Sequence, residues 1–296
     1  MISQYYSPLR YPGGKAKIQD YLQLLFELNS LEDGNYVEPY AGGASVALSL
    51  LFNEYVAKIH INDFDKSIHA FWHSVLNDTE NLCKLILDTS INVDVWRKQK
   101  EVQLSKDEAS KLDLGFSTFF LNRTNRSGIL KAGIIGGYDQ RGKWKMDARF
   151  NKRDLISRIQ KIARYKDRIV LYNEDACKLI PKLNAYLPKN SLIYFDPPYY
   201  NKGKDLYINF YRHEDHEKIS KLIDQLDTQN WVVSYDNVLA IKEMYSRFKQ
   251  IEYGLSYSVG KATKGREVMI FSNGLIVPEV DNPTDRKSIS RYNKAS

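Results

Sequence analysis

The stretch Asp196-Pro197-Pro198-Tyr199 combines a carboxylate, two rigid prolines and an aromatic ring. The apolar run 191–195 before it is typical of a buried strand, and proline ends strand pairing and keeps the preceding residue extended. A carboxylate and a fixed carbonyl are acceptors that together can hold an exocyclic amino group, and a tyrosine ring can stack on a flat base. We therefore predict that this stretch holds an amino-bearing nucleobase lifted from its helix, at the carboxyl end of a strand.

A second stretch, Tyr36 to Ser45, has the glycine turn of a nucleotide-binding unit. A short strand leads into Gly42 and Gly43, whose lack of a side chain lets the backbone approach a ligand, and a helix follows. A second strand then ends at Asp63, 20 residues after Gly43, where an acid would bond ribose hydroxyls. The pattern predicts a mononucleotide-binding βαβ unit, and it leaves open whether the ligand is a dinucleotide or an adenosyl cofactor.

Composition narrows the class of protein. The 296 residues are enough for two lobes, the hydrophobic share of 43% is ordinary, and no long apolar run or signal-like start appears, so we expect a cytoplasmic protein. Cys83 and Cys177 stand far apart without metal-ligand spacing, so we expect reduced, structural cysteines and no metal site. The net charge of +7 favours a polyanionic partner.

The positive charge is concentrated in one segment. Residues 123–168 carry 14 Lys and Arg against 4 Asp and Glu, a net +10, so the rest of the chain is net −3. The first part is a glycine-containing loop in which aromatic side chains alternate with bases, a composition that suits groove entry, stacking and phosphate contact. The candidate nucleic-acid contacts are Arg123, Asn125, Arg126, Tyr138, Arg141, Lys143 and Lys145.

The order of predicted elements indicates an α/β domain with an insertion. Strands and helices alternate up to residue 76, stop alternating, and resume at Ile169–Tyr172. We therefore predict a doubly wound, Rossmann-like sheet interrupted by a helical insertion. The predicted parts are a cofactor-binding half (1–76), a helical, basic target-recognition insertion (77–168), a catalytic half (169–277) and a polar, frayed tail (278–296).

Two local expectations concern element ends. Ser105 and Glu108 have the spacing of a capping box, which predicts a helix that opens there and runs towards Phe120. Strands are expected over 251–259 and 267–272, with a mobile loop from Gly260 to Arg266 between them.

Taken in order, these motifs resemble those of the DNA adenine methylases. The matching stretches are Tyr11-Pro-Gly-Gly-Lys15, Glu38-Pro-Tyr-x-Gly-Gly-x-Ser45, Asn62-Asp63, Asn122-Arg123 and Asp196-Pro-Pro-Tyr199. The similarity is to the class in which the cofactor motif comes first, the catalytic motif last and the target-recognition region between them. It covers roughly residues 8–273.

The resemblance implies S-adenosylmethionine as the cofactor and the N6 amino group of adenine in double-stranded DNA as the methyl acceptor. It implies that Asp196, Pro197, Pro198 and Tyr199 form the catalytic site around a flipped-out base. Asp196 also borders the cofactor, whose other implied neighbours are Tyr11, Lys15, Glu38, Ala41, Gly42, Asp63 and Asp175. Glu38, Ala41 and Gly42 would lie beside its methionine part, Asp63 at its ribose and Asp175 near its adenine.

Three other readings of the same residues stay open at this point. A methyltransferase that acts on the N4 amino group of cytosine would use similar chemistry. A non-catalytic DNA-binding protein could share the scaffold, and a nicotinamide-dependent oxidoreductase could share the first βαβ unit, although Asp196-Pro-Pro-Tyr199 would then have no role. We expect the protein to act as a monomer, and a cognate restriction endonuclease acting separately is a possible partner.

Overall fold

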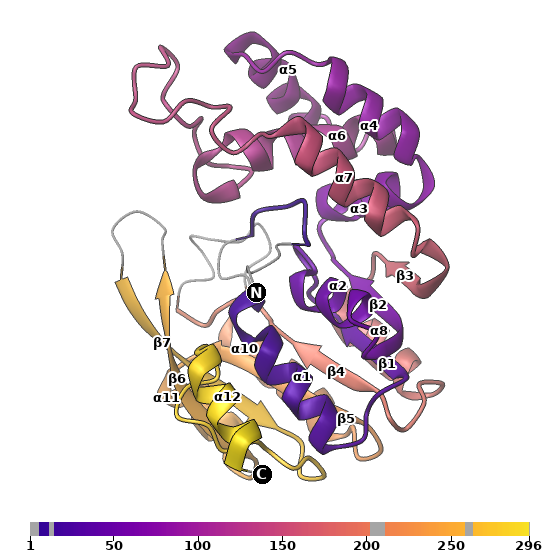
Figure 1. The fold of residues 1–296 in the computed structure, drawn as a ribbon, viewed down its shortest axis with the longest axis vertical. Helices are drawn as coiled ribbons and strands as arrows, with labels where there is room; N and C mark the ends of the chain where they lie inside the picture. The colour runs from indigo at the N-terminus through magenta and orange to yellow at the C-terminus, as the bar shows by residue number, and fades with distance from the viewer. Residues whose placement is uncertain (1–5, 12–14, 202–210, 258–262, 296) are drawn as a thin grey trace. The chain divides into compact units, whose positions relative to one another are not determined.

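The computed structural model describes residues 6–11, 15–201, 211–257 and 263–295 (Figure 1). Its strands form a seven-stranded sheet in the order β3-β2-β1-β4-β5-β7-β6. Contacts divide the chain into two compact units. The helical unit contains residues 1–14 and 63–173, and the sheet unit contains residues 15–62 and 174–296. The predicted insertion, 77–168, falls within the helical unit, which extends further at both ends.

Parallel strands form the centre of the sheet unit. β1 (Gly34–Glu38) pairs in parallel with β2 (Val56–Asn62) on one side and with β4 (Leu192–Phe195) on the other. β4 in turn pairs in parallel with β5 (Asn230–Asp236). These strands are buried along most of their length because helices cover both faces of the sheet. The doubly wound α/β class predicted from the sequence is confirmed.

The last two strands form an antiparallel hairpin. β6 (Lys249–Tyr257) pairs with β7 (Thr263–Phe271), and β7 pairs antiparallel with β5. The loop predicted from Gly260 to Arg266 is therefore wrong for residues 263–266, which belong to β7; residues 258–262 lie outside the described residues. The first residues of β7 are polar, so no strand signal appears there in the sequence. A strand near a sheet edge needs backbone pairing but no alternation of apolar residues.

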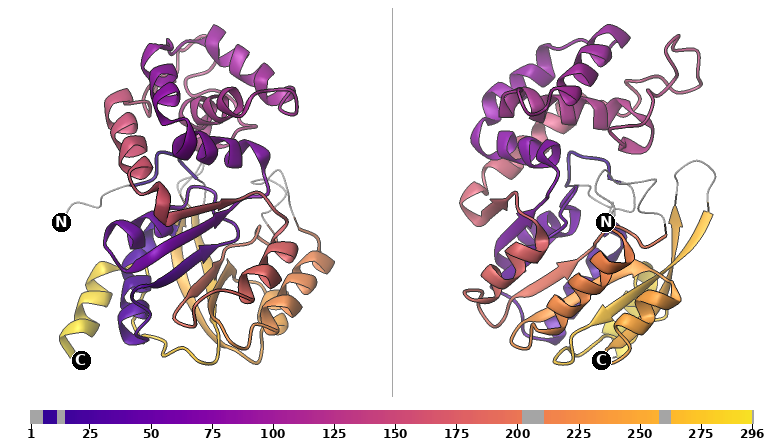
Figure 2. Two further views of the ribbon diagram at one scale, coloured as in Figure 1. Left: turned by 90° about the vertical axis from the view of Figure 1, so that its right-hand side faces the viewer. Right: turned by 180° about the vertical axis from the view of Figure 1, so that it is seen from behind.

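Helices lie on both sides of this sheet. Figure 2 shows α1 (Gln19–Leu28) and α12 (Arg286–Ala295) on one side and α8 (Ala176–Asn184) and α10 (His213–Asp224) on the other. The remaining described helices of the unit are η1 (Lys15–Ile18), α2 (Ser45–Phe52), which contacts α1, and α11 (Leu239–Met244), which contacts α10.

Helix α12 corrects the prediction of a frayed tail from residue 278. Its Ile289 is only 6% exposed, and Arg286 Nε lies 2.5 Å from Asp20 Oδ2 on α1. The tail is polar on average, so its composition predicted disorder. One amphipathic turn and an ion pair are nevertheless enough to hold a short helix against α1, which a composition argument cannot detect.

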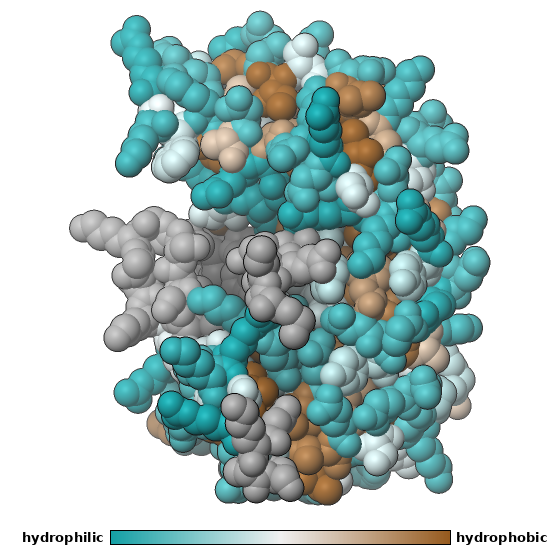
Figure 3. Space-filling view, in the orientation of Figure 1, coloured by the Kyte–Doolittle hydropathy of each residue, from teal (hydrophilic) through white to brown (hydrophobic). Residues whose placement is uncertain are grey.

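The helical unit is built around the long helix α6 (Lys111–Thr124). Phe119 of α6 stacks on Phe71 of α3 with ring centroids 5.9 Å apart, and Phe150 meets Phe119 edge-on at 5.3 Å. The face of this unit seen in Figure 3 is mainly hydrophilic, with hydrophobic residues visible among the hydrophilic ones. The other elements are α3 (Lys66–Asn77), α4 (Thr79–Asp88), α5 (Val93–Leu104), η2 (Arg126–Gly128), α7 (Lys152–Ala163), η3 (Lys166–Arg168) and β3 (Ile169–Tyr172).

The start of α6 differs from the prediction. Ser105 is the C-cap of α5, and the helix that reaches Phe120 begins at Lys111. Its N-cap is Ser110, whose Oγ accepts the backbone N–H of Asp113 at 3.0 Å and donates to the Asp113 carboxylate at 2.6 Å. The sequence holds two capping patterns five residues apart. The prediction of a helix start at Ser105 is wrong because α5 continues to Leu104 and Ser105 caps its end, so the next helix starts only after Ser110.

Hydrogen bonds join the residues at which the chain leaves the sheet unit to those at which it returns. Asn62, the last residue of β2, donates from Nδ2 to the carbonyl of Glu174 at 3.0 Å and accepts the Glu174 N–H at 2.9 Å. Within the helical unit, Asn173 Nδ2 donates to the carbonyl of Asp63 at 2.7 Å. The chain therefore leaves and re-enters the sheet unit at neighbouring residues.

Candidate functional site

The candidate site lies where the sheet order reverses. β1 and β4 are adjacent parallel strands, with Val37 paired to Ile193, although they are far apart in sequence. Glu38 is the last residue of β1, and Asp196 directly follows β4, so their carboxyl groups lie at the same end of neighbouring strands. Ligands of open α/β sheets bind at this switch point, outside the carboxyl ends of the strands.

Asp196 is fixed through one of its two carboxylate oxygens. Its Oδ1 lies 3.2 Å from Lys15 Nζ and accepts a 3.0 Å hydrogen bond from Ser234 Oγ, which itself accepts from Tyr194 at 2.8 Å. Within the described residues, no hydrogen bond reaches Oδ2. The Asp196 side chain is 22% exposed, and burial raises the pKa of its carboxyl to about 6, although Lys15 lowers it.

The turn after Asp196 is held from the end of β5. The carboxylate of Asp236 accepts the backbone N–H of Tyr200 at 2.8 Å and that of Asn201 at 2.9 Å. Pro197 and Pro198 supply no N–H for a strand ladder, so this carboxylate takes over the anchoring of the chain. The strand end, the prolines and Asp236 together fix the direction of the Asp196 carboxylate.

Lys15 and Tyr199 belong to a buried polar network behind Asp196. Lys15 Nζ donates to Tyr199 Oη at 3.0 Å and to Glu267 Oε2 at 2.9 Å, and Tyr199 Oη donates to Glu267 Oε1 at 2.6 Å. The Tyr199 ring is 1% exposed. Sequence reasoning missed Glu267 and Ser234, because neither stands in a recognisable motif and both reach the site only through strand pairing.

The glycine turn after β1 has the expected backbone. Gly42 has φ of 48°, and Ala44, the N-cap of α2, has φ of 46°, a left-handed conformation that is uncommon for alanine. The turn is tied down because the Ala41 N–H donates to the carbonyl of Asn62 at 2.8 Å. Beside it, Glu38 accepts the N–H of Ala47 at 3.2 Å, and burial raises the pKa of Glu38 to about 8.

The remaining residues that the resemblance implies for the cofactor are divided between the two units. Asp175 belongs to the sheet unit and caps α8, accepting the N–H of Cys177 at 2.8 Å. Tyr11 and Asp63 belong to the helical unit. Asp63 Oδ1 accepts the N–H of Asp65 at 2.9 Å in the turn that precedes α3, and Tyr11 is partly exposed.

The comparison with known families decides the class of this protein. The sequence matches the profile of the family described as D12 class N6 adenine-specific DNA methyltransferase over residues 11–259. The chain belongs to this family. The D12 methyltransferase methylates adenine in DNA at N6 and uses S-adenosyl-L-methionine. The cytosine, oxidoreductase and binding-only readings are set aside.

Three individual proteins illustrate the similarity. The type II methyltransferase M.MjaIII of Methanocaldococcus jannaschii is 23% identical over 240 residues, 74% of this chain and 79% of that protein. A SAM-dependent methyltransferase structure from Agrobacterium tumefaciens has a TM-score of 0.42 at 9% identity, covering 88% and 63% of the two chains. TrmK of M. capricolum with S-adenosyl-homocysteine has a TM-score of 0.34 at 7% identity, covering 84% and 68%.

Several candidate DNA contacts of the D12 methyltransferase lie on the exposed loop that follows α6. Tyr138 is 60% exposed and packs edge-on against Trp96, with ring centroids 5.6 Å apart. Arg126, Arg141 and Lys143 are exposed. Lys145 is exposed and donates to the carbonyl of Gln140, which closes the loop on itself.

Arg123 and Asn125 have internal partners instead. Asn125 is fully buried; its Oδ1 accepts Trp96 Nε1 at 2.7 Å, and its Nδ2 donates to the carbonyls of Ile129 and Leu130, both at 3.0 Å. Arg123 Nε donates to the carbonyl of Arg149 at 2.6 Å, and burial lowers the pKa of its guanidinium to about 9. In this structure, both side chains order the loop from within.

Asn122 holds the segment that leads into Tyr11. It accepts the N–H of Arg10 at 2.7 Å and donates to the carbonyls of Arg10 and Gly128 at 2.7 and 2.9 Å. Gly128 has φ of 77°, and a Cβ there would lie 2.3 Å from the carbonyl oxygen of Arg10. The asparagine and the glycine are therefore both required by this close backbone approach.

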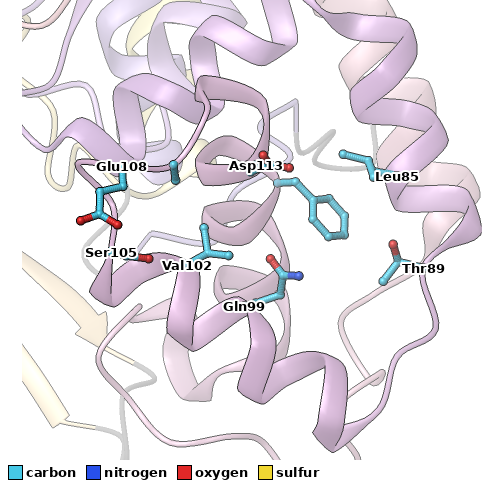
Figure 4. A pocket seen from close by; sticks show the side chains of 9 residues that line it. Leu85, Thr89, Gln99, Val102, Ser105, Glu108 and Asp113 are labelled. Atoms are coloured by element: carbon cyan, nitrogen blue, oxygen red, sulfur yellow. The ribbon is translucent and has the colours of Figure 1, made fainter.

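A hollow of about 390 Å³ lies elsewhere in the helical unit, among α4, α5 and α6 (Figure 4). None of the residues predicted for catalysis, cofactor or DNA faces it, and we assign it no role. Its lining residues are Leu85, Thr89, Gln99, Val102, Ser105, Glu108, Ala109, Asp113 and Phe116. Within the described ranges, no helix is both long enough and apolar enough to cross a bilayer.

Proposed function

We propose that Asp196 Oδ2 and the Pro197 carbonyl accept the N6 amino group of a flipped-out adenine in double-stranded DNA. The observation that supports this most is the hydrogen bonding of Asp196, whose Oδ1 is held by Lys15 and Ser234 while no described residue occupies Oδ2. The lone pair of an adenine amino group is delocalised into the ring. Two acceptors that hold its hydrogens favour a pyramidal nitrogen with a lone pair available for attack.

The cofactor, when bound, supplies a methyl group that its sulfonium centre already activates. The protein therefore needs neither a metal nor a covalent intermediate, and its task is alignment for direct in-line transfer. Alignment of this kind can contribute about 7–11 kcal/mol. Tyr200, which is partly exposed, is the ring proposed to stack on the base, because the Tyr199 ring predicted for this role is only 1% exposed. Such a contact is worth about 1–3 kcal/mol per base, which helps to offset the few kcal/mol that flipping costs.

The residues at the end of β1 fit the methionine part of the cofactor. Gly42 and Ala41 form a turn without bulky side chains, and Glu38 is a buried carboxyl next to it. Among the described residues Glu38 forms no ion pair, and such a buried carboxyl is the chemical complement of an α-ammonium group. In the same proposal Tyr11 and Lys15 border the pocket, Asp63 binds the ribose, and Asp175 approaches the adenine.

Cofactor binding is expected to release a proton from Glu38. With a pKa of about 8, this carboxyl is mostly protonated at pH 7. An ammonium group beside it favours the ionised form, so binding at pH 7 releases roughly one proton and tightens as the pH rises towards 8. Calorimetric titrations in buffers of different ionisation enthalpy measure this number. For Glu38→Gln, the buffer dependence should vanish; an unchanged dependence would assign the proton to another group.

The helical unit is the target-recognition part of the enzyme in this proposal. Arg126, Arg141 and Lys143 contact phosphates or base edges, and Tyr138 offers a ring for stacking. Arg123 and Asn125 contribute by fixing the loop that carries these residues. The boundaries 1–76, 77–168, 169–277 and 278–296 are the functional division that goes with this assignment.

Replacing Arg126 or Arg141 with alanine is expected to weaken DNA binding or relax site preference. Each lost phosphate contact should reduce the slope of log affinity against log salt by about 0.9. Fluorescence anisotropy with a duplex, titrated at several salt concentrations, measures this slope. Lys221→Ala removes one exposed charge from α10 and serves as the control. Unchanged affinity, slope and site preference in both arginine variants would show that the loop does not contact DNA.

Sequencing of DNA methylated by the purified enzyme tests the whole proposal. Methyladenine confined to one short motif is expected, and it would give the target sequence. Methyladenine scattered without a motif would contradict site-specific recognition. The proposal also includes action as a monomer in the cytoplasm and a cognate restriction endonuclease, acting separately, that cuts the same motif.

A further inference from the structure

The side chain of Glu267 is fully buried on β7, and three hydrogen bonds to its carboxylate lie within the described part of the chain. Tyr199 donates to Oε1 at 2.6 Å, while Lys15 and Tyr253 donate to Oε2 at 2.9 and 2.7 Å. A carboxylate that receives only donors, one of them an ammonium group, is ionised. Glu267 is therefore a fixed negative charge in the interior, behind the candidate site.

This charge is linked to Asp196 through a single cation. Lys15 Nζ donates to Glu267 Oε2 at 2.9 Å and to Tyr199 Oη at 3.0 Å, and it forms an ion pair with Asp196 Oδ1 at 3.2 Å. The Lys15 side chain is 5% exposed and that of Glu267 is 0% exposed, whereas that of Asp196 is 22% exposed. Glu267 is thus the end of the network that solvent does not reach, and Asp196 is the end that is partly exposed.

Glu267 also determines the orientation of the Tyr199 ring. The hydroxyl of Tyr199 accepts from Lys15 and donates to Glu267, so its position is set by two charged groups. Charge-assisted hydrogen bonds of this kind are shorter and stronger than neutral ones. Lys15 Nζ lies 5.1 Å from the centre of the same ring. Asp196 and the buried ring of Tyr199 are therefore both held through Lys15 and Glu267.

We infer that Glu267 is a positioning residue for methyl transfer, which holds Lys15 and the buried Tyr199 so that Asp196 Oδ2 keeps the orientation that the flipped adenine requires. This inference rests on the role proposed above for Asp196. Glu267 touches neither of the reacting groups. Its effect reaches them through the Lys15 ammonium and the Tyr199 hydroxyl.

The ionisable groups around Asp196 come from six elements. Lys15 on η1 lowers the pKa of Asp196, whereas the negative charge of Glu267 on β7 raises it. The other groups coupled to this carboxyl or to the triad are Tyr36 and Glu38 on β1, Tyr194 on β4, Tyr235 on β5 and Tyr253 on β6. Removing the negative charge of Glu267 should therefore lower the pKa of the Asp196 carboxyl.

The test is the pH profile of single-turnover methyl transfer by the full-length Glu267→Gln variant, with cofactor and DNA saturating. We expect the rate at pH 7.5 to fall by about 10²-fold, the loss that a misplacement of about 1 Å can cause. The affinity for S-adenosylmethionine should change less than about threefold, and the acid limb should move to lower pH. Glu252→Gln, an exposed carboxylate on the same hairpin, is the matched control and should match the wild type.

A purely structural role would reduce the folded fraction without moving the acid limb, and that result would overturn the inference. A wild-type rate and profile in a folded Glu267→Gln variant would do the same. If this variant does not fold, Tyr199→Phe decides, because it keeps the ring and removes the hydroxyl held by Glu267. An unchanged rate in Tyr199→Phe would then refute the role of Glu267. Methyl transfer by Asp196→Ala in the same assay would instead show that the proposed site is wrong.

Discussion

Asp196→Ala is expected to lower the single-turnover rate of methyl transfer by at least about 10²–10³-fold. The substitution removes the acceptor that orients the adenine amino group, whereas the cofactor's methionine part lies at Glu38 and Gly42 in the proposed site. Lys15 keeps Glu267 as a partner at 2.9 Å, so no buried charge is left without its counter-ion. The variant should therefore fold, and its affinity for S-adenosylmethionine and for DNA should be largely retained.

Quench-flow measurement of labelled methyl incorporation gives this rate, and calorimetry gives the cofactor affinity. Asp227→Ala, an exposed carboxylate just before β5, is a suitable control that should leave both quantities unchanged. Turnover by Asp196→Ala close to that of the wild type would mean that another acid holds the base. Loss of cofactor binding together with activity would mean that Asp196 acts mainly on the cofactor.

Lys15→Met is expected to lower the free energy of unfolding by about 3–5 kcal/mol at pH 7.5, which is typical when one partner of a buried ion pair is removed. The Lys15 side chain is 5% exposed and is the cation between Asp196 and Glu267. Without it, the buried carboxylate of Glu267 and the partly buried carboxylate of Asp196 lose the cation between them. Methionine keeps most of the side-chain volume, so the loss reports the missing charge rather than a cavity.

The destabilisation should shrink as the pH falls from 7.5 to 5.5. Lys15 lowers the pKa of Asp196, so in the variant this pKa rises above its wild-type value of about 6. A carboxyl whose folded pKa exceeds its unfolded pKa takes up a proton on folding, and the cost of charging it disappears as the pH falls through the folded value. Urea unfolding at both pH values measures the difference. Lys17→Met, on the exposed side of η1, is the control, and an equal loss at both pH values would contradict the account.

The sequence predicted the parts of the site that depend on local backbone requirements. Asp196-Pro-Pro-Tyr199 could be placed at a strand end because proline ends pairing there, and Gly42 marked a turn that requires positive φ. Parallel strands with buried faces then brought Glu38 and Asp196 to one end of the sheet. These are consequences of residue type within a few positions, which a single sequence records.

Glu267, Tyr253 and Ser234 could not be predicted in the same way. Glu267 lies opposite Tyr253 only because of the register of the β6–β7 hairpin, and Ser234 reaches Asp196 only because β5 lies next to β4. Register of this kind is set by the packing of the whole sheet. A single charged residue at the start of an apolar run gives no sign that it is buried.

In the basic loop after α6, the sequence also did not show which polar side chains are exposed. Asn125 and Arg126 are adjacent polar residues in a segment rich in bases, and both were predicted to contact DNA. The structure buries Asn125 against Trp96, a residue 29 positions earlier, and leaves Arg126 exposed. Composition predicts that such a loop carries charge, but the direction of each side chain depends on contacts made far away in the chain.

The hydrogen bonds between Asn62, at the end of β2, and Glu174 have a consequence for how the sequences of such enzymes can diverge. Two hydrogen bonds join these residues, so the ends of the intervening segment 63–173 are held at fixed positions beside the sheet, like the ends of a loop. The entropy of closing a loop grows only with the logarithm of its length, about 0.6 kcal/mol for each doubling. Insertions, deletions and new side chains between residues 63 and 173 therefore cost the catalytic scaffold little. Under the target-recognition role proposed for the helical unit, selection can change the DNA sequence that is read while the methyl-transfer chemistry stays as it is.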